Sequence, residues 1–295
     1  MQAISKTFLC VALGALLTTI APLASAQKSE ASVPKRAVNA AELHAVPASI
    51  TGLQKRSFQW FWDSGNPENG LIPDHYPGDS FASIAAVGFG LTTYGVGVER
   101  GWITRDQAID RTLATLRFFN NAPQGDAEEG ETGYHGFFYH FLDMKTGKRY
   151  ANWVEVSSVD TTLLLGGVLF AQSYYDRDTA KEKEIRDLAD AIYRRIDWTW
   201  LQKRSPLISM GWTPGGKTIP HDWEGYTEGM LVYILALGSP THPVGDDTWS
   251  AWTKTYDKTW GEFHGQTFLN FAPMFGHQDR HPPVDFGGIR VAWNR

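Results

Sequence analysis

Acidic and aromatic residues alternate just ahead of a strongly apolar run in the last third of the chain. Glu224 and Glu228 are four residues apart, with Trp223 and Tyr226 beside them. Apolar spacing predicts a helix over Trp223–Leu237, and residues four apart in a helix project from one face. Both carboxylates would then face the same way from its first turns. Acid groups ringed by aromatic side chains are typical of a site that holds and cleaves a sugar.

Glycoside hydrolysis normally needs two carboxyl groups that flank the scissile bond. In a helix, Glu224 and Glu228 would lie only about 6 Å apart. That separation places both on one side of a sugar, so Glu224 is predicted to bind substrate and not to supply the second catalytic group.

Two further carboxylates lie where a second apolar helix is expected to begin. Asp160 opens an otherwise apolar run that continues to Val168. A buried carboxylate must be paired or hydrogen-bonded, because burying it bare is costly. Asp160 either caps the helix together with Thr161 and Thr162, or belongs to a site and contacts the substrate or supports the acid. Glu155, on the loop that enters the helix, is a second candidate.

Twelve tryptophans are more than packing alone requires, and amphipathic rings suit the stacking faces of sugars. The alternative is that most of them belong to the core. The rings predicted to line one cleft are Trp62, Trp153, Trp212, Trp223 and Tyr226. Asp74 and Asp143 are predicted to line or brace that cleft, although both positions are also typical of turns.

The chain shows no sign of metal or cofactor chemistry. Its histidines have no metal-ligand spacing on one helix, and there is no HExxH pattern, glycine-rich phosphate loop or serine nucleophile elbow. Its single cysteine, Cys10, falls in the N-terminal apolar run. Neither a metal nor a cofactor is predicted, and a zinc site formed by histidines that converge in space is left as the alternative.

The N-terminus reads as a secretory signal over residues 1–26, with Ala24-Ser25-Ala26 as the cleavage site. A polar lead-in over residues 27–48 and one domain over residues 49–295 follow. The net charge of −5 does not favour binding to nucleic acid or to anionic lipid. We therefore expect a periplasmic or secreted monomer without a membrane anchor, whose partner is an oligo- or polysaccharide.

Apolar spacing and stop signals favour an all-α domain. Glycines inside apolar helices, in Val87–Gly90 and Leu164–Gly167, indicate close helix–helix approach. Alternating apolar and amphipathic helices indicate an inner ring shielded by an outer one. A hairpin turn is expected at Met144–Gly147. The predicted helices are Ser49–Ser64, Ser80–Glu99, Thr104–Asn121, Val156–Tyr175, Thr179–Gln202, Trp223–Leu237 and Asp246–Lys258.

Several blocks together resemble the bacterial glycoamylase-like family. The stretch HDWEGYTEGMLVYILALGSPTHP, residues 221–243, follows the family pattern W-x-G-Y-N-E-x-M-x-x-Y-x-L-A-L-G-S-P-T-H-P. The other matching blocks are Phe58–Trp62, Gly70–Asp74, Ser83–Leu91, Gly97–Ile103, Gly136–Arg149 and Glu155–Leu165. The characterised enzymes of this family include endo-β-1,2-glucanases built as (α/α)6 barrels.

The resemblance implies an (α/α)6 toroid with a small β-hairpin insertion, incomplete in this chain. It also implies a secreted, inverting glycoside hydrolase that acts on a neutral β-glucan in the manner of an endo-β-1,2-glucanase. Glu228 would be the general acid, because it takes the place of the glutamate in the family's Tyr-Asn-Glu block. Thr227 stands where the family has Asn. A purely structural alternative is that Glu228 favours a helix N-terminus through its charge.

Residues 279–287 depart from the family pattern, and the family's catalytic base falls beyond Arg295, the last residue. The chain is therefore expected to be a truncated domain, and the sequence leaves open whether it turns over substrate. A non-catalytic carbohydrate-binding remnant is the main alternative. A polysaccharide lyase fits less well, because the residues around the aromatics are acidic and not basic.

Overall fold

The computed structural model describes residues 48–278. The expected signal sequence, nearly all of the lead-in and the altered block at 279–287 lie outside the described residues. Within the described part, no helix is long and apolar enough to cross a membrane.

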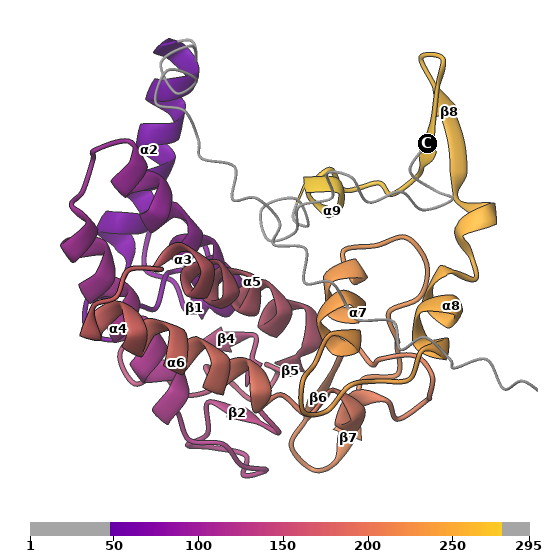
Figure 1. Cartoon of the computed structure of the whole chain (residues 1–295). Helices are drawn as coiled ribbons and strands as arrows, with labels where there is room; N and C mark the ends of the chain where they lie inside the picture. The colour runs from indigo at the N-terminus through magenta and orange to yellow at the C-terminus, as the bar shows by residue number, and fades with distance from the viewer. Residues whose placement is uncertain (1–47, 279–295) are drawn as a thin grey trace, which may run out of the picture. The chain divides into compact units, whose positions relative to one another are not determined.

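The described chain is mostly helical, and the longer helices agree with the predicted ones (Figure 1). Five predicted helices extend too far. Residues 82–83 and 156–157 form strands, α6 stops at Arg194, α7 begins only at Met230, and α8 stops at Thr253. The helices are α2 Ala48–Ser64, α3 Ile84–Glu99, α4 Arg105–Asn121, α5 Ser158–Tyr174, α6 Ala180–Arg194, α7 Met230–Leu237, α8 Asp247–Thr253 and α9 Phe275–Gln278, with 3-10 turns at Trp198–Leu201 and Tyr256–Lys258.

Helices α3 and α5 approach each other through glycines, as predicted. A Cβ atom on Gly167 would lie 2.1 Å from the carbonyl oxygen of Gly88. A Cβ on Gly88 would lie 2.2 Å from the carbonyl oxygen of Leu163. No side chain fits at either position, so the two backbones pack directly against each other.

Helices α4 and α6 pack against each other and against this pair. Helix α6 is amphipathic and buries one face, with Ile185, Ala189 and Ile192, whereas α3 and α5 are buried over much of their surface. Apolar helices covered by amphipathic ones are what the sequence pattern predicts. The closed (α/α)6 ring stays a prediction.

The described residues are mostly helical, but they also contain three antiparallel sheets, more than the one small hairpin that we expected. The largest has the order β2-β3-β5-β6-β7, with β2 Gly133–Tyr134, β3 Phe137–Tyr139, β5 Val156–Ser157, β6 Gly211–Thr213 and β7 Lys217–Thr218. The smaller sheets pair β1 Ala82–Ser83 with β4 Phe141–Leu142, and β8 Trp260–Phe263 with β9 Gln266–Leu269. These strands are two to four residues long, too short for alternation in the sequence to reveal them.

The turn predicted at Met144–Gly147 is confirmed. The backbone N–H of Gly147 donates to the carbonyl oxygen of Asp143 at 2.9 Å, and Asp143 Oδ1 accepts from the N–H of Thr146 at 2.7 Å. The strands around it find most of their partners elsewhere, since β4 pairs with β1 and β3 pairs with β2 and β5.

Two helices that continue directly from short strands set up the site. Strand β1 runs into α3, and β5 runs into α5. Ser83 and Ser157 are the N-caps, and their hydroxyl oxygens accept from the N–H of Ala86 and Asp160. The N-terminus of α5 is thereby fixed to the five-stranded sheet.

Candidate active site

A histidine and two carboxylates meet at the junction of β5 and α5. His140 Nδ1 lies 3.0 Å from Glu155 Oε1, and His140 Nε2 lies 3.3 Å from Asp160 Oδ1. Asp160 Oδ2 also accepts a hydrogen bond from the Ser157 hydroxyl at 2.5 Å. The predicted need for a partner at Asp160 is thus confirmed, although the helix cap is Ser157 and not Asp160 with Thr161 and Thr162.

Strand pairing brings these residues together. Tyr139 pairs with Val156 across β3 and β5, and the His140 N–H donates to the carbonyl oxygen of Glu155 at 2.9 Å. The register therefore sets the imidazole beside the Glu155 carboxylate, and the first turn of α5 brings Asp160 to its other nitrogen. The sequence analysis identified Glu155 and Asp160 but missed His140, whose place depends on this register.

The cluster favours a doubly protonated imidazole, since each ring nitrogen faces a carboxylate oxygen. Burial lowers the pKa of His140, but its hydrogen bond to Glu155 and the negative charges of Asp160, Glu155 and Asp74 outweigh that effect and raise the pKa above its usual value. Burial raises the pKa of Asp160, against the opposing effects of His140 and the Ser157 hydroxyl. The raised pKa of His140 favours a protonated imidazole between the carboxyl groups of Glu155 and Asp160.

Among the described residues, His140, Glu155 and Asp160 also form the one group whose ligand atoms lie within 4.8 Å of one another, as a metal site would require. A metal ion would need one imidazole nitrogen free of its proton. Here both nitrogens face carboxylate oxygens at 3.0 and 3.3 Å. The contact of Nδ1 with Glu155 is a hydrogen bond and the contact of Nε2 with Asp160 is within ion-pair distance, so we interpret the cluster as an ion-paired triad.

The segment with Glu224 and Glu228 is a loop, which corrects the prediction of a helix over Trp223–Leu237. Gly225 has a φ of +76°, and its N–H donates to the carbonyl oxygen of Trp252 at 2.8 Å, so a helix cannot run through it. Glu224 is exposed and Glu228 is half-buried. The argument that a helical spacing of about 6 Å disqualifies Glu224 therefore no longer applies.

Trp223 connects this loop to the N-terminus of α5. Its indole N–H donates to the Ser158 hydroxyl at 2.8 Å, and its carbonyl oxygen accepts from the Tyr233 hydroxyl at 2.5 Å. Ser158 is two residues from Asp160, so the loop carrying Glu228 is attached next to the ion-paired triad. Trp223 is only 7% exposed, which leaves little ring surface for stacking on a sugar.

The other predicted site residues lie at several places. Trp212 is buried in β6 and packs against Tyr134. Trp62, on α2, packs against the guanidinium of Arg111, which is on α4. Tyr226 is half-buried, with its ring 5.7 Å from that of Tyr256. Asp74 is close enough to His140 for its charge to raise the pKa of that imidazole. Of the aromatic residues that we expected to line one cleft, Trp153 has the most exposed ring, at 60%.

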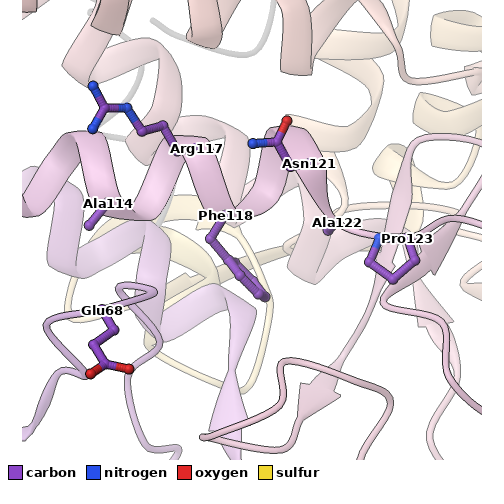
Figure 2. A pocket seen from close by; sticks show the side chains of 7 residues that line it. All are labelled: Glu68, Ala114, Arg117, Phe118, Asn121, Ala122 and Pro123. Carbon is purple, nitrogen blue, oxygen red and sulfur yellow. The ribbon is translucent and has the colours of Figure 1, made fainter.

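An open hollow of about 440 Å³ lies elsewhere, between Glu68 and the C-terminal half of α4 (Figure 2). Figure 2 shows Glu68 below α4 and the Phe118 ring pointing down from the helix. None of the predicted site residues lines this hollow. Its lining residues are Glu68, Ala114, Arg117, Phe118, Asn121, Ala122 and Pro123.

Comparison with known proteins finds similarity to proteins that are named for glucan hydrolysis. Residues 220–295 match the family model described as "Putative glucoamylase". An exo β-1,2-glucooligosaccharide sophorohydrolase (non-reducing end) from Parabacteroides distasonis is 29% identical over 240 residues, which make up 76% of this chain and 32% of the relative.

Two solved structures are similar as well. One is the crystal structure of a putative glucoamylase from Bacteroides uniformis, with a TM-score of 0.68 and 28% identity, covering 79% of this chain and 55% of that one. The other is a β-1,2-glucanase from Parabacteroides distasonis, with a TM-score of 0.65 and 25% identity, covering 74% and 34%. This chain therefore spans about a third of the curated relative and about half of the Bacteroides uniformis structure. The resemblance to the glycoamylase-like family that the sequence motifs predict is confirmed.

Proposed function

We propose that this chain carries a glycoside hydrolase site for a neutral β-glucan, with β-1,2-linked glucan as the substrate. The observation that carries the proposal is the triad of His140, Glu155 and Asp160 beside the loop that holds Glu228. Two similar proteins are named for β-1,2-glucan chemistry, the sophorohydrolase and the β-1,2-glucanase from Parabacteroides distasonis. The predicted secretion to the periplasm or medium, the monomeric state and the (α/α)6 ring belong to the same proposal.

Glu228 is the proposed general acid, which protonates the leaving oxygen. Its loop is fastened by Trp223 to Ser158 and so to the N-terminus of α5. An inverting reaction needs a second carboxyl group about 6.5–9.5 Å from the acid to activate a water molecule. Among the carboxylates of this chain, Asp160 should be tested first as this second group, because Ser157 and His140 hold its carboxylate in one orientation. In this proposal, Glu155 and Glu224 bind sugar hydroxyls.

The test is to measure binding and turnover separately on the purified chain. Linear β-1,2-glucooligosaccharides are titrated calorimetrically, and products are followed by chromatography. Glu228→Gln should lower kcat by at least about 100-fold, the lower end for general acid catalysis, and leave Kd nearly unchanged. Asp257→Asn, which alters an exposed acid on the 3-10 turn Tyr256–Lys258, is the control and should change neither value.

Each outcome decides between hypotheses. Turnover that depends on Glu228, with the α-anomer formed first in a nuclear magnetic resonance time course, supports an inverting hydrolase. Binding without turnover by the unmodified chain would replace the enzyme by the carbohydrate-binding alternative. No binding of any β-1,2-glucooligosaccharide would overturn the proposed substrate.

A further inference from the structure

Four aromatic rings form a patch on the surface next to the triad. The ring of Phe81 lies 4.3 Å from that of Phe141 and 4.9 Å from that of Tyr150, and the ring of Trp153 lies 5.7 Å from that of Phe141. Tyr150 is 47% exposed and Trp153 is 60% exposed. We call these four residues the aromatic platform. Its two outer rings present apolar surface to solvent without a covering element in the described chain.

The loop that carries the outer rings is held from inside by Arg149. The guanidinium Nε donates to the carbonyl oxygen of Val154 at 2.7 Å, and Nη2 donates to that of Asn152 at 2.5 Å. The same guanidinium lies 4.9 Å from the centre of the Tyr139 ring. An exposed loop fixed by a forked set of hydrogen bonds loses little conformational entropy on binding, so the platform is organised before a ligand arrives.

The platform continues directly into the triad. The Phe141 ring stacks on the His140 imidazole, with 3.7 Å between centroids and 20° between planes. Glu155 follows Trp153 after the buried Val154, and the side chains of His140 and Glu155 are still 26% and 23% exposed. A ligand that lies on the platform would therefore reach polar groups at its edge.

The chemistry around the platform selects the ligand. Aromatic faces pack against the apolar C–H face of a pyranose ring, and a carboxylate at the edge accepts hydrogen bonds from hydroxyl groups. Asp74, Glu155 and Asp160 place negative charge nearby, since each raises the pKa of His140. Negative charge disfavours uronates and phosphorylated sugars, so a neutral hexose fits best.

We infer that the aromatic platform is a sugar-stacking subsite, on which Trp153 and Tyr150 hold one neutral glucosyl unit beside the triad. This inference rests on the proposed function for the class of ligand, although the platform itself is defined by its own geometry. Arg149 is a positioning residue for the platform and does not contact the sugar.

The experiment measures Kd for linear β-1,2-glucooligosaccharides by calorimetry on the purified chain. Trp153→Ala and Tyr150→Ala should each weaken binding by about tenfold or more, which corresponds to about 1.4 kcal/mol. Trp153→Phe keeps an aromatic face and should retain most of the affinity. Phe263→Ala removes a ring that is 65% exposed on β8, outside the platform, and should leave Kd unchanged.

Circular dichroism and thermal unfolding of each variant show that lost binding is not lost folding, and surface rings are expected to pass this control. Tight binding by both alanine variants would overturn the subsite and leave the proposed substrate intact. Binding of another neutral glucan in place of the β-1,2-glucan, still dependent on Trp153, would support the subsite and refute the proposed substrate. If the unmodified chain binds no glucan, the platform is not a sugar site. The same conclusion follows if the unmodified chain self-associates and Trp153→Ala abolishes that self-association without changing the Kd for glucan.

Discussion

At the scale of single residues, His140 holds the proposed site together. Its two nitrogens face Glu155 and Asp160, so one imidazolium offsets the charge of two carboxylates that would otherwise repel each other. Removing the cation leaves two acids close together in a partly buried place, which is costly. A triad of this kind is expected to fix the orientation of both acids, and Asp160 in particular.

His140→Gln should destabilise the protein by about 1.5–3 kcal/mol at mildly acidic pH, the range for hydrogen bonds to charged groups. The pKa of His140 is raised by folding, so its contribution to stability is complete below the unfolded value of about 6.5. The contribution disappears as the pH rises through the folded pKa. The loss caused by His140→Gln should accordingly shrink from pH 5.5 to pH 9 in urea unfolding curves.

His264→Gln is the matched control, because His264 lies in the β8–β9 turn and is exposed. It should have little effect at either pH. An equal loss for His140→Gln at pH 5.5 and pH 9 would mean that packing, and not charge, explains the role of His140.

At the scale of elements, the direct contact between α3 and α5 positions the N-terminus of α5, and with it Asp160. Gly167→Ala adds a Cβ where the carbonyl oxygen of Gly88 stands 2.1 Å away. Backbone atoms cannot yield as a flexible side chain can, so we expect a loss of about 1–3 kcal/mol from overpacking. At about 2–4 °C per kcal/mol for a domain of this size, differential scanning calorimetry should detect the shift.

Gly52→Ala provides the comparison in another helix. Gly52 lies in α2, and the nearest atom to an added Cβ is the end of the Arg56 side chain at 3.9 Å. Alanine is a better helix former than glycine by about 1 kcal/mol, so this variant should be as stable as the unmodified chain or more stable. Unfolding temperatures that fall equally in both variants would refute the close-packing explanation.

Sequence pattern predicted the elements that local chemistry specifies. Thr104 and Gln107 form a capping box at the start of α4, and the glycines of α3 and α5 do mark a close approach. The pattern failed where tertiary contacts decide. The apolar run up to Leu237 looked helical from Trp223 onward, but the bond from Trp223 to Ser158 and the φ of Gly225 hold the first residues in a loop.

The candidate site was predictable in the same uneven way. Asp160 was found because an acid in an apolar run demands a partner. His140 and the platform were missed as a group, because β1, β4 and β5 are only two residues long and their register alone brings Phe81, Phe141 and Glu155 together. Strands so short give no periodic signal.

At the scale of the whole molecule, helices, sheets and loops are joined by ion pairs that respond to pH. Arg105 on α4 binds the buried Glu182 on α6 through two hydrogen bonds of 2.8 and 2.9 Å. These bonds, chiefly, lower the pKa of Glu182 below its usual value. The pair connects the two amphipathic helices that cover α3 and α5, so its state affects the packing of both layers.

The protein should be most stable at mildly acidic pH. The lowered pKa of Glu182 means that its contribution is present above the unfolded value of about 4.5 and is lost as the pH falls through the folded value. Asp197, whose pKa is also lowered, acts in the same direction. Asp160 and His140 have raised pKa values, so each contributes less as the pH rises, His140 above about 6.5.

The opposing slopes predict that the unfolding temperature, measured by calorimetry from pH 3 to pH 9, rises to a maximum between about pH 4.5 and 6.5 and then declines. Glu182→Gln should flatten the acidic limb, because the buried pair no longer depends on protonation, and should leave the alkaline limb in place. His140→Gln should do the reverse. An unfolding temperature that keeps rising from pH 6.5 to pH 9 would contradict a triad held by a charged imidazole, because the raised pKa of His140 requires its contribution to fall over that range.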